Sequence, residues 1–187
     1  MMNIDITKAT RRDTPMLRQL YEFYCYDFSE FMSSDVTDTG MYTDDKFLTG
    51  YWPEPAWSSY IVRVDGRLAG FAWVLKTTLF PDDEQPDNVA MRRALAEANL
   101  LAGEHTLIEE FFIMRGHRHK GVGEYVANWL FDRYPGVWEV SEIVANTPAQ
   151  AFWRRIIDRY TRGGYIEVNV NSQNWQGPVQ VFRSNTR

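Results

Sequence analysis

Apolar positions along this chain repeat with two different periods, and each period predicts a different kind of element. Ile4 and Ile6 alternate with polar residues, which indicates a strand that buries one face. A helix is predicted next, with either Asp13 or Thr14 as its cap and Pro15 in its first turn. Its apolar stripe follows the helical spacing of three and four: Leu17, Leu20, Tyr21, Tyr24 and Phe28.

The middle of the chain predicts a hairpin and then a helix. Two β-rich runs, residues 59–64 and 67–77, flank Asp65-Gly66, which is a strong two-residue turn signal. An acidic loop over residues 81–87 follows. A helix then runs up to Gly103 on the apolar positions Met91, Leu95, Ala98 and Leu101. This helix is expected to pack on the surface, with a lid or a dimer element as the alternatives.

The second half predicts strand, helix, strand, helix and two closing strands. The strands span residues 106–114, 137–145, 165–170 and 179–183, with a turn-rich segment at 171–178. The first helix starts after Gly121 and stops at Pro135-Gly136. The last helix is expected to use Thr147 as its cap, Pro148 at the first helical position and Gln150 in a capping box. Its apolar stripe is Phe152, Ile156 and Tyr160.

This order of elements is that of a mixed α/β protein. The helix after the glycines provides the crossover that parallel strands require. We therefore expect a single mixed, mostly antiparallel sheet of about seven strands with helices on both faces. A chain of 187 residues without a repeat or linker suits one domain, over residues 1–187.

Composition excludes several classes of function. The formal net charge is −5 and no basic stripe lies outside one loop, so nucleic-acid binding is not expected. No apolar run approaches the ~20 residues that a membrane helix needs, and residues 1–5 do not resemble a signal peptide. Cys25 is the one cysteine, so no internal disulfide can form and a cytoplasmic location is expected.

Residues 115–123, Arg-Gly-His-Arg-His-Lys-Gly-Val-Gly, carry the clearest chemistry of the chain. They join an apolar strand to an amphipathic helix and collect basic side chains around glycines. Gly121 can adopt a positive φ and so turn amides toward a ligand. The helix that follows adds unpaired N–H groups and the positive end of its dipole. The pattern predicts a phosphate-binding turn.

The string from Arg118 to Gly123 resembles the Arg/Gln-x-x-Gly-x-Gly/Ala loop of the GNAT superfamily, whose members are N-acyltransferases that use acetyl-CoA. Asn146, Ala149 and Phe152 match the family's last helix, whereas Trp153 stands where the family often has tyrosine. The resemblance implies a GNAT-like acyl-CoA N-acyltransferase fold, with acetyl-CoA as the acyl donor. The residues that it places at the donor are Phe112, Ile113, Met114, Arg118, His119, Lys120, Gly121, Val122, Gly123, Glu124, Asn146, Phe152 and Trp153.

The resemblance also implies transfer of an acetyl group to a primary amine of a small or peptidyl acceptor, by direct attack in a ternary complex. Glu110 and Glu109 are the candidate bases, because they interrupt an apolar strand and burial would raise a carboxyl pKa. The amide of Ile113 or Met114 would stabilise the oxyanion. Tyr160 could protonate the thiolate only if the last helix is displaced, and a place in the core is the alternative for it.

Several alternatives remain open at this point. A non-catalytic acyl-CoA sensor or assembly module fits the missing tyrosine at Trp153. His117 and His119 lack partners at metal-site spacing, so no metal is expected. Six acidic residues in 27–45, with the loop 82–87, would favour a cationic acceptor if they line the cleft, whereas solvated loops are the commoner explanation. A homodimer is also considered.

Overall fold

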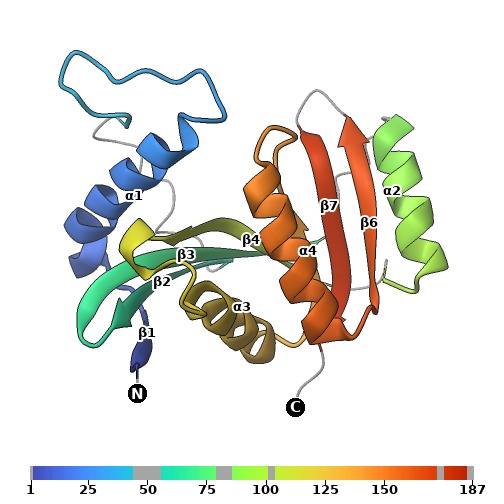
Figure 1. Ribbon diagram of the computed structural model, residues 1–187. Helices are drawn as coiled ribbons and strands as arrows, with labels where there is room; N and C mark the ends of the chain where they lie inside the picture. Colours follow the sequence, from blue (N-terminus) through green and yellow to red (C-terminus); the bar gives the residue numbers. More distant parts are fainter. Residues whose placement is uncertain (1, 44–55, 79–85, 101–103, 172–174, 185–187) are drawn as a thin grey trace. The chain divides into compact units, whose positions relative to one another are not determined.

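The computed structural model describes residues 2–43, 56–78, 86–100, 104–171 and 175–184. Within these residues seven strands form a mixed sheet in the order β1-β2-β3-β4-β5-β7-β6 (Figure 1). β4 and β5 pair in parallel, whereas β1–β2, β2–β3, β5–β7 and β6–β7 pair antiparallel. The strands are β1 (Ile4–Lys8), β2 (Trp57–Val64), β3 (Arg67–Thr78), β4 (Glu104–Ile113), β5 (Gly136–Ser141), β6 (Tyr165–Asn171) and β7 (Gln176–Ser184). The helices are α1 (Thr14–Phe28), α2 (Pro86–Glu97), α3 (Val122–Arg133) and α4 (Thr147–Thr161).

The chain divides into two compact units. The first contains Met1–Leu75 and Glu109–Val126, and the second contains Lys76–Ile108 and Ala127–Arg187. Strand β4 and helix α3 therefore each begin in one unit and end in the other. Each unit has a core of its own, and we describe the two separately.

The core of the first unit forms where α1 packs on β2 and β3. In the predicted stripe of α1, Leu17, Leu20 and Tyr21 are buried, whereas Tyr24 and Phe28 are half-buried. The ring of Tyr21 stacks on Trp73 with 5.0 Å between centroids. The β2–β3 turn is the predicted Asp65-Gly66, with φ of 49° and 78°, the positive values that a type I′ turn requires. A Cβ on Gly70 would lie 1.9 Å from the carbonyl oxygen of Phe112, so only glycine permits this strand contact.

The second unit has helices on both faces of its strands, as expected. Successive side chains of β7 point to opposite faces. Val179 and Val181 pack with Met91 and Leu95 of α2 in one cluster. On the other face, Phe182 contacts Phe131 of α3 with 4.9 Å between ring centroids. Helix α2 runs beside β6 (Figure 1), so it is a packed surface helix here.

Several predicted boundaries are wrong in detail. Asn146, not Thr147, caps α4, because its side chain accepts from the amide of Ala149 at 3.1 Å. Gln150 completes no capping box, since its side-chain amide donates to the carbonyl oxygens of Ile143 and Val144, each at 3.0 Å.

Strand β5 ends at Ser141 rather than at residue 145, and β7 begins at Gln176 instead of residue 179. Helix α2 ends at Glu97. Residues 81–85 of the acidic loop, the acidic residues 44–45, Leu101, Gly103 and residues 172–174 of the turn-rich segment lie outside the described part of the chain.

Candidate active site

The predicted phosphate-binding turn follows β4 in the first unit. A short 3-10 helix, Arg115–His117, leads into residues 118–121, and α3 begins at Val122. His119 and Gly121 both have left-handed backbone, with φ of 59° and 80°. A left-handed conformation is uncommon for a residue that is not glycine, and at His119 it is a local strain of the kind found at ligand-binding turns.

Backbone amides of this turn are left without acceptors. The amide of Tyr125 donates to the carbonyl oxygen of Gly121 at 3.0 Å, which is the first bond of α3. Five other amides of the turn donate to no carbonyl oxygen within the described residues: those of His119, Lys120, Gly121, Val122 and Gly123. Unpaired donors at a helix N-terminus suit an anion. That this turn binds a phosphate stays a prediction from the sequence.

Two arginines of this loop are tied to α1, although the Arg115 side chain stays exposed. Asp27, at the end of α1, accepts from Arg115 Nε at 2.9 Å and also forms an ion pair with Arg118. Arg118 Nε donates to the carbonyl oxygen of Ile113 at 2.6 Å, and its guanidinium lies 5.6 Å from the centre of the Phe112 ring. The Arg118 side chain thus fixes the end of β4, and its charge is balanced by Asp27.

The two remaining basic residues of the string are exposed. Lys120 Nζ donates to the carbonyl oxygen of Gly116 at 2.6 Å, which curls the side chain back over the loop. His119 is exposed at the strained position. Glu124 lies in the first turn of α3, where the helix dipole stabilises a carboxylate.

Glu110 is a partly buried carboxylic acid on β4. The hydroxyl of Tyr21 donates to its Oε1 at 3.2 Å, and Tyr24 also hydrogen-bonds it. Burial raises the pKa of Glu110 to about 7, against the lowering effect of the two tyrosine hydrogen bonds. The same burial, and then the Glu110 charge, raise the pKa of Tyr24 well above its usual value, so this phenol stays protonated. Glu110 can therefore exchange a proton near neutral pH.

Glu109 has a different environment. Adjacent residues of a strand point to opposite faces, and Glu109 is exposed whereas Glu110 packs against α1. Partial desolvation raises the pKa of Glu109, but no tyrosine holds its carboxylate. Of the two candidate bases, the structure gives Glu110 the hydrogen-bonded position.

The two candidate oxyanion donors differ as well. The amide of Met114 donates to the carbonyl oxygen of Ala69 at 2.8 Å, so it is not available, and this prediction is corrected. The amide of Ile113, one residue earlier, points to the opposite edge of the strand because edges alternate along a strand.

The remaining predicted residues lie in the second unit. Asn146 caps α4, and Phe152 and Trp153 contact each other with 5.0 Å between ring centroids. Trp153 is buried, with 5% of its surface exposed. The hydroxyl of Tyr160 donates to Asp132 at 2.7 Å, and its ring packs against Phe131. Tyr160 is half-buried at this position, and its suggested role at the thiolate stays a prediction.

Sequence reasoning missed the polar partners of the site. It assigned Tyr21 and Tyr24 to a core stripe, although their hydroxyls hold Glu110. In the second unit, it also missed Glu142, a buried acid after β5 whose pKa is raised by burial to about 8. Both tyrosines lie at helical spacing beside apolar residues, so only the strand that packs against them reveals the second role.

The described residues contain neither a metal-ligating cluster nor a membrane-spanning helix. No group of three or more metal-ligating side chains occurs among the described residues. In that same part of the chain, no helix is long and apolar enough to cross a membrane.

The mixed sheet, with β4 and β5 in parallel, and the glycine turn at the start of α3 are consistent with an acyltransferase. The profile of the acetyltransferase (GNAT) family matches residues 17–157. The chain belongs to this family.

Solved structures have the same fold at low sequence identity. An acetyltransferase from Thermus thermophilus shares 13% identity and superposes with a TM-score of 0.60, over 97% of each chain. An aminoglycoside acetyltransferase, AAC(6')-Ib in complex with coenzyme A, shares 14% with a TM-score of 0.56, over 97% of this chain and 95% of that one. A ribosomal-protein alanine N-acetyltransferase from Escherichia coli shares 9% with a TM-score of 0.51, over 99% and 96%. The search of curated proteins gives no match.

Proposed function

We propose that this chain, as a single domain, transfers the acetyl group of acetyl-CoA to a primary amine by direct attack in a ternary complex. One observation carries the proposal. A partly buried glutamate with a pKa of about 7 lies on the strand that leads directly into the turn with unpaired amides. Proton acceptor and phosphate-binding turn are thus joined by a few residues of one strand, Glu110 to Ile113.

The turn would hold the diphosphate of the donor. The amides of residues 119–123 are the donors that meet no acceptor in the described chain, and α3 adds its positive end. Arg118 would contribute indirectly, because its side chain holds the Ile113 carbonyl and Asp27. The known coenzyme A complex of a protein with this fold supports this choice of donor.

Glu110 would act as the general base. A lysine-like ammonium has a pKa of ~10.4 and must lose a proton before it can attack. With its pKa near 7, Glu110 is ionised in about half the molecules at neutral pH, close to the optimum for proton transfer. Glu110 takes up the ammonium proton, directly or through a water, and the nitrogen lone pair that this frees attacks the thioester carbonyl carbon. The C–N bond forms, and the second nitrogen proton leaves to solvent as the tetrahedral intermediate collapses.

Collapse of the tetrahedral intermediate breaks the C–S bond. The Ile113 amide is the remaining candidate for stabilising the oxyanion, since Met114 is engaged with Ala69. Coenzyme A leaves as a thiolate, and solvent protonates it, because a thiol pKa of ~8.5 makes it a tolerable leaving group. Neither Trp153, whose indole is only a donor, nor Tyr160, bonded to Asp132, is assigned this step.

The acceptor is proposed to be a cationic small molecule or peptide. Glu30, Asp35 and Asp38 are exposed in the segment that follows α1. Asp27 is not one of the carboxylates proposed to attract the acceptor, because Arg115 and Arg118 neutralise its charge. Proteins of similar fold include an aminoglycoside acetyltransferase, and aminoglycosides are polyamines.

The test measures thiol release from acetyl-CoA with a panel of primary amines. Glu110→Gln should lower kcat/KM by ~10²-fold or more, whereas Glu109→Gln should stay within about twofold, because only the former removes a general base. Binding of acetyl-CoA, followed by calorimetry, should be equal in both variants. Equal losses in the two variants would remove Glu110 from the mechanism.

A second candidate function is a non-catalytic acyl-CoA sensor. The observation that favours it is Trp153, which is buried where the family often has a tyrosine. A sensor would bind acetyl-CoA yet release no thiol above the hydrolysis background with any amine of the panel. An enzyme would release thiol at a rate that rises with the concentration of the acceptor amine.

A further inference from the structure

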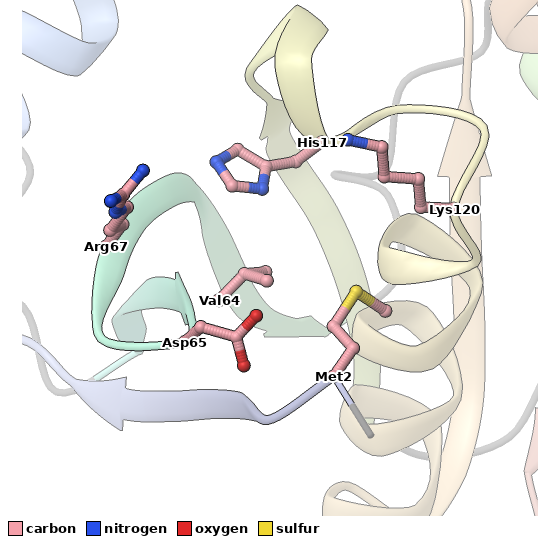
Figure 2. Close-up of a pocket in the computed structure, with 6 residues that line it drawn as sticks. All are labelled: Met2, Val64, Asp65, Arg67, His117 and Lys120. Atoms are coloured by element: carbon pink, nitrogen blue, oxygen red, sulfur yellow. The ribbon is translucent and has the colours of Figure 1, made fainter.

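A pocket of ≈ 610 Å³ lies in the first unit beside the glycine loop (Figure 2). Its six lining residues come from the N-terminus, from the β2–β3 turn and from the loop after β4: Met2, Val64, Asp65, Arg67, His117 and Lys120. This volume lies within the range of small-molecule pockets. None of the residues assigned to proton transfer or to the oxyanion lines it.

Positive charge dominates the polar part of this pocket. Arg67 and Lys120 carry positive charge, and the imidazole ring of His117 offers a nitrogen donor. Figure 2 shows the His117 ring and the Arg67 side chain on either side of the space above Val64. Within the described residues, neither side chain has a hydrogen bond or an ion pair. Lys120 gives one of its three N–H donors to Gly116 and keeps two.

The one acidic group in the pocket is already engaged. Asp65 Oδ1 accepts from the amide of Asn3 at 2.9 Å, and Asp65 lies in the strained turn of the hairpin. It forms no ion pair with Arg67. Two cations and an imidazole thus face one carboxylate that has a partner elsewhere, and this imbalance favours an anion over a cation.

We propose that this pocket binds a phosphate monoester. The guanidinium fork of Arg67 matches two phosphate oxygens, the ammonium of Lys120 supplies further charge-assisted bonds, and the His117 ring can add a hydrogen bond. Val64 and Met2 offer an apolar floor, which suits an organic group that carries the phosphate rather than the free ion. Lys120 connects the two sites, because its amide belongs to the diphosphate turn and its side chain lines the pocket.

The phosphate has two chemical sources. Coenzyme A carries a 3′-phosphate monoester besides its diphosphate, and the shared Lys120 makes this the first arm of the test; this arm rests on the proposed function. The second source is a separate phosphorylated compound that binds without coenzyme A.

The first arm compares coenzyme A with 3′-dephospho-coenzyme A by calorimetry on the full chain. Coenzyme A should bind about tenfold more tightly, and Arg67→Ala or His117→Ala should abolish that advantage while the affinity for the dephospho compound stays unchanged. Arg12→Ala is the matched control: it removes an exposed arginine of the same unit outside the pocket, and it should keep the advantage.

The second arm titrates inorganic phosphate and adenosine 3′-phosphate against the wild type and Arg67→Ala. Binding that disappears in Arg67→Ala, without discrimination between the two coenzymes, would assign the pocket to a separate phosphate compound. If the protein binds neither coenzyme, the proposed function fails while this arm still decides on the pocket. No discrimination in the first arm and no Arg67-dependent binding in the second would overturn the proposal.

Discussion

Glu110 lies between apolar packing and two phenol groups, and these act on its proton in opposite directions. Burial disfavours the carboxylate, whereas hydrogen bonds from Tyr24 and Tyr21 stabilise it, and burial prevails to leave the pKa at about 7. A general base must be ionised to act. We therefore expect kcat/KM to fall about tenfold per pH unit below pH 7 and to level off above it.

The pH–rate profile measures this expectation. Glu110→Gln should lack the break near pH 7 and keep only the slope that the acceptor amine contributes. Glu109→Gln should retain the break, because its carboxylate is exposed and lacks the tyrosine partners. If the break near pH 7 persisted in the profile of Glu110→Gln, it would report the titration of another group, and Glu110 would not be the base.

Glu142 offers a separate test, of stability rather than activity. It is buried, its Oε1 has no partner in the described residues, and Gln180 alone donates to its other oxygen, at 3.1 Å. Burial raises its pKa from 4.5 to about 8. Because the folded pKa lies above the unfolded one, the native state holds this proton more tightly. Stability from Glu142 is therefore full below pH 4.5 and is lost as the pH rises through about 8.

Glu142→Gln mimics the protonated form and so should remove this loss. We expect the Tm of Glu142→Gln to exceed that of the wild type at pH 9 and to equal it at pH 4.5. In a chain of this size each kcal/mol corresponds to roughly 2–4 °C, which differential scanning calorimetry resolves. A Tm difference that is the same at both pH values would contradict a titrating Glu142.

Among the elements, α4 shows how a helix start is decided. Asn146 and Thr147 are both good caps, and Pro148 is compatible with either. The structure selects Asn146, whose Oδ1 accepts from Ala149. Asn146→Ala should therefore lower stability by about 1 kcal/mol, whereas Thr147→Ala should change it little. Thermal unfolding of both variants measures the difference, and a larger loss at Thr147 would reverse the assignment.

The spacing of apolar residues predicted most strands and helices, because the residues that each element buries are set by its own local sequence. The Asp65-Gly66 turn was predictable for the same reason. The ends of the strands were less predictable. Strand β5 ends at Ser141, although the backbone amides of Glu142 and Val144 still donate hydrogen bonds to β7. Local patterns do not distinguish such a ladder-edge segment from a strand.

The candidate site was predictable only as far as it is local. The turn around Gly121 and the position of Glu110 follow from one stretch of sequence. The links that position them do not: Asp27 meets Arg115 and Arg118 across 88 and 91 residues, and Tyr21 meets Glu110 across 89. Such pairs are set by how α1 packs in the first unit, and a single sequence does not show this.

At the scale of the whole molecule, the proposed reaction requires both substrates to be bound before chemistry occurs. A double-displacement route would need a nucleophile to carry the acetyl group, and Cys25 is the only thiol. Burial, and next the charges of Glu22 and Glu110, raise the pKa of Cys25 to about 12. Its reactive thiolate form is therefore scarce at neutral pH.

Initial-velocity plots should accordingly intersect when acetyl-CoA and acceptor are varied together, as in a ternary complex, and should not be parallel. Cys25→Ser should keep kcat within about twofold, because a neutral thiol that packs against the core contributes no covalent chemistry. Incubation with labelled acetyl-CoA alone should leave no acetyl group on the protein after denaturation. Parallel plots together with label on Cys25 would replace direct attack by an acyl-enzyme route, since only a covalent carrier accounts for both.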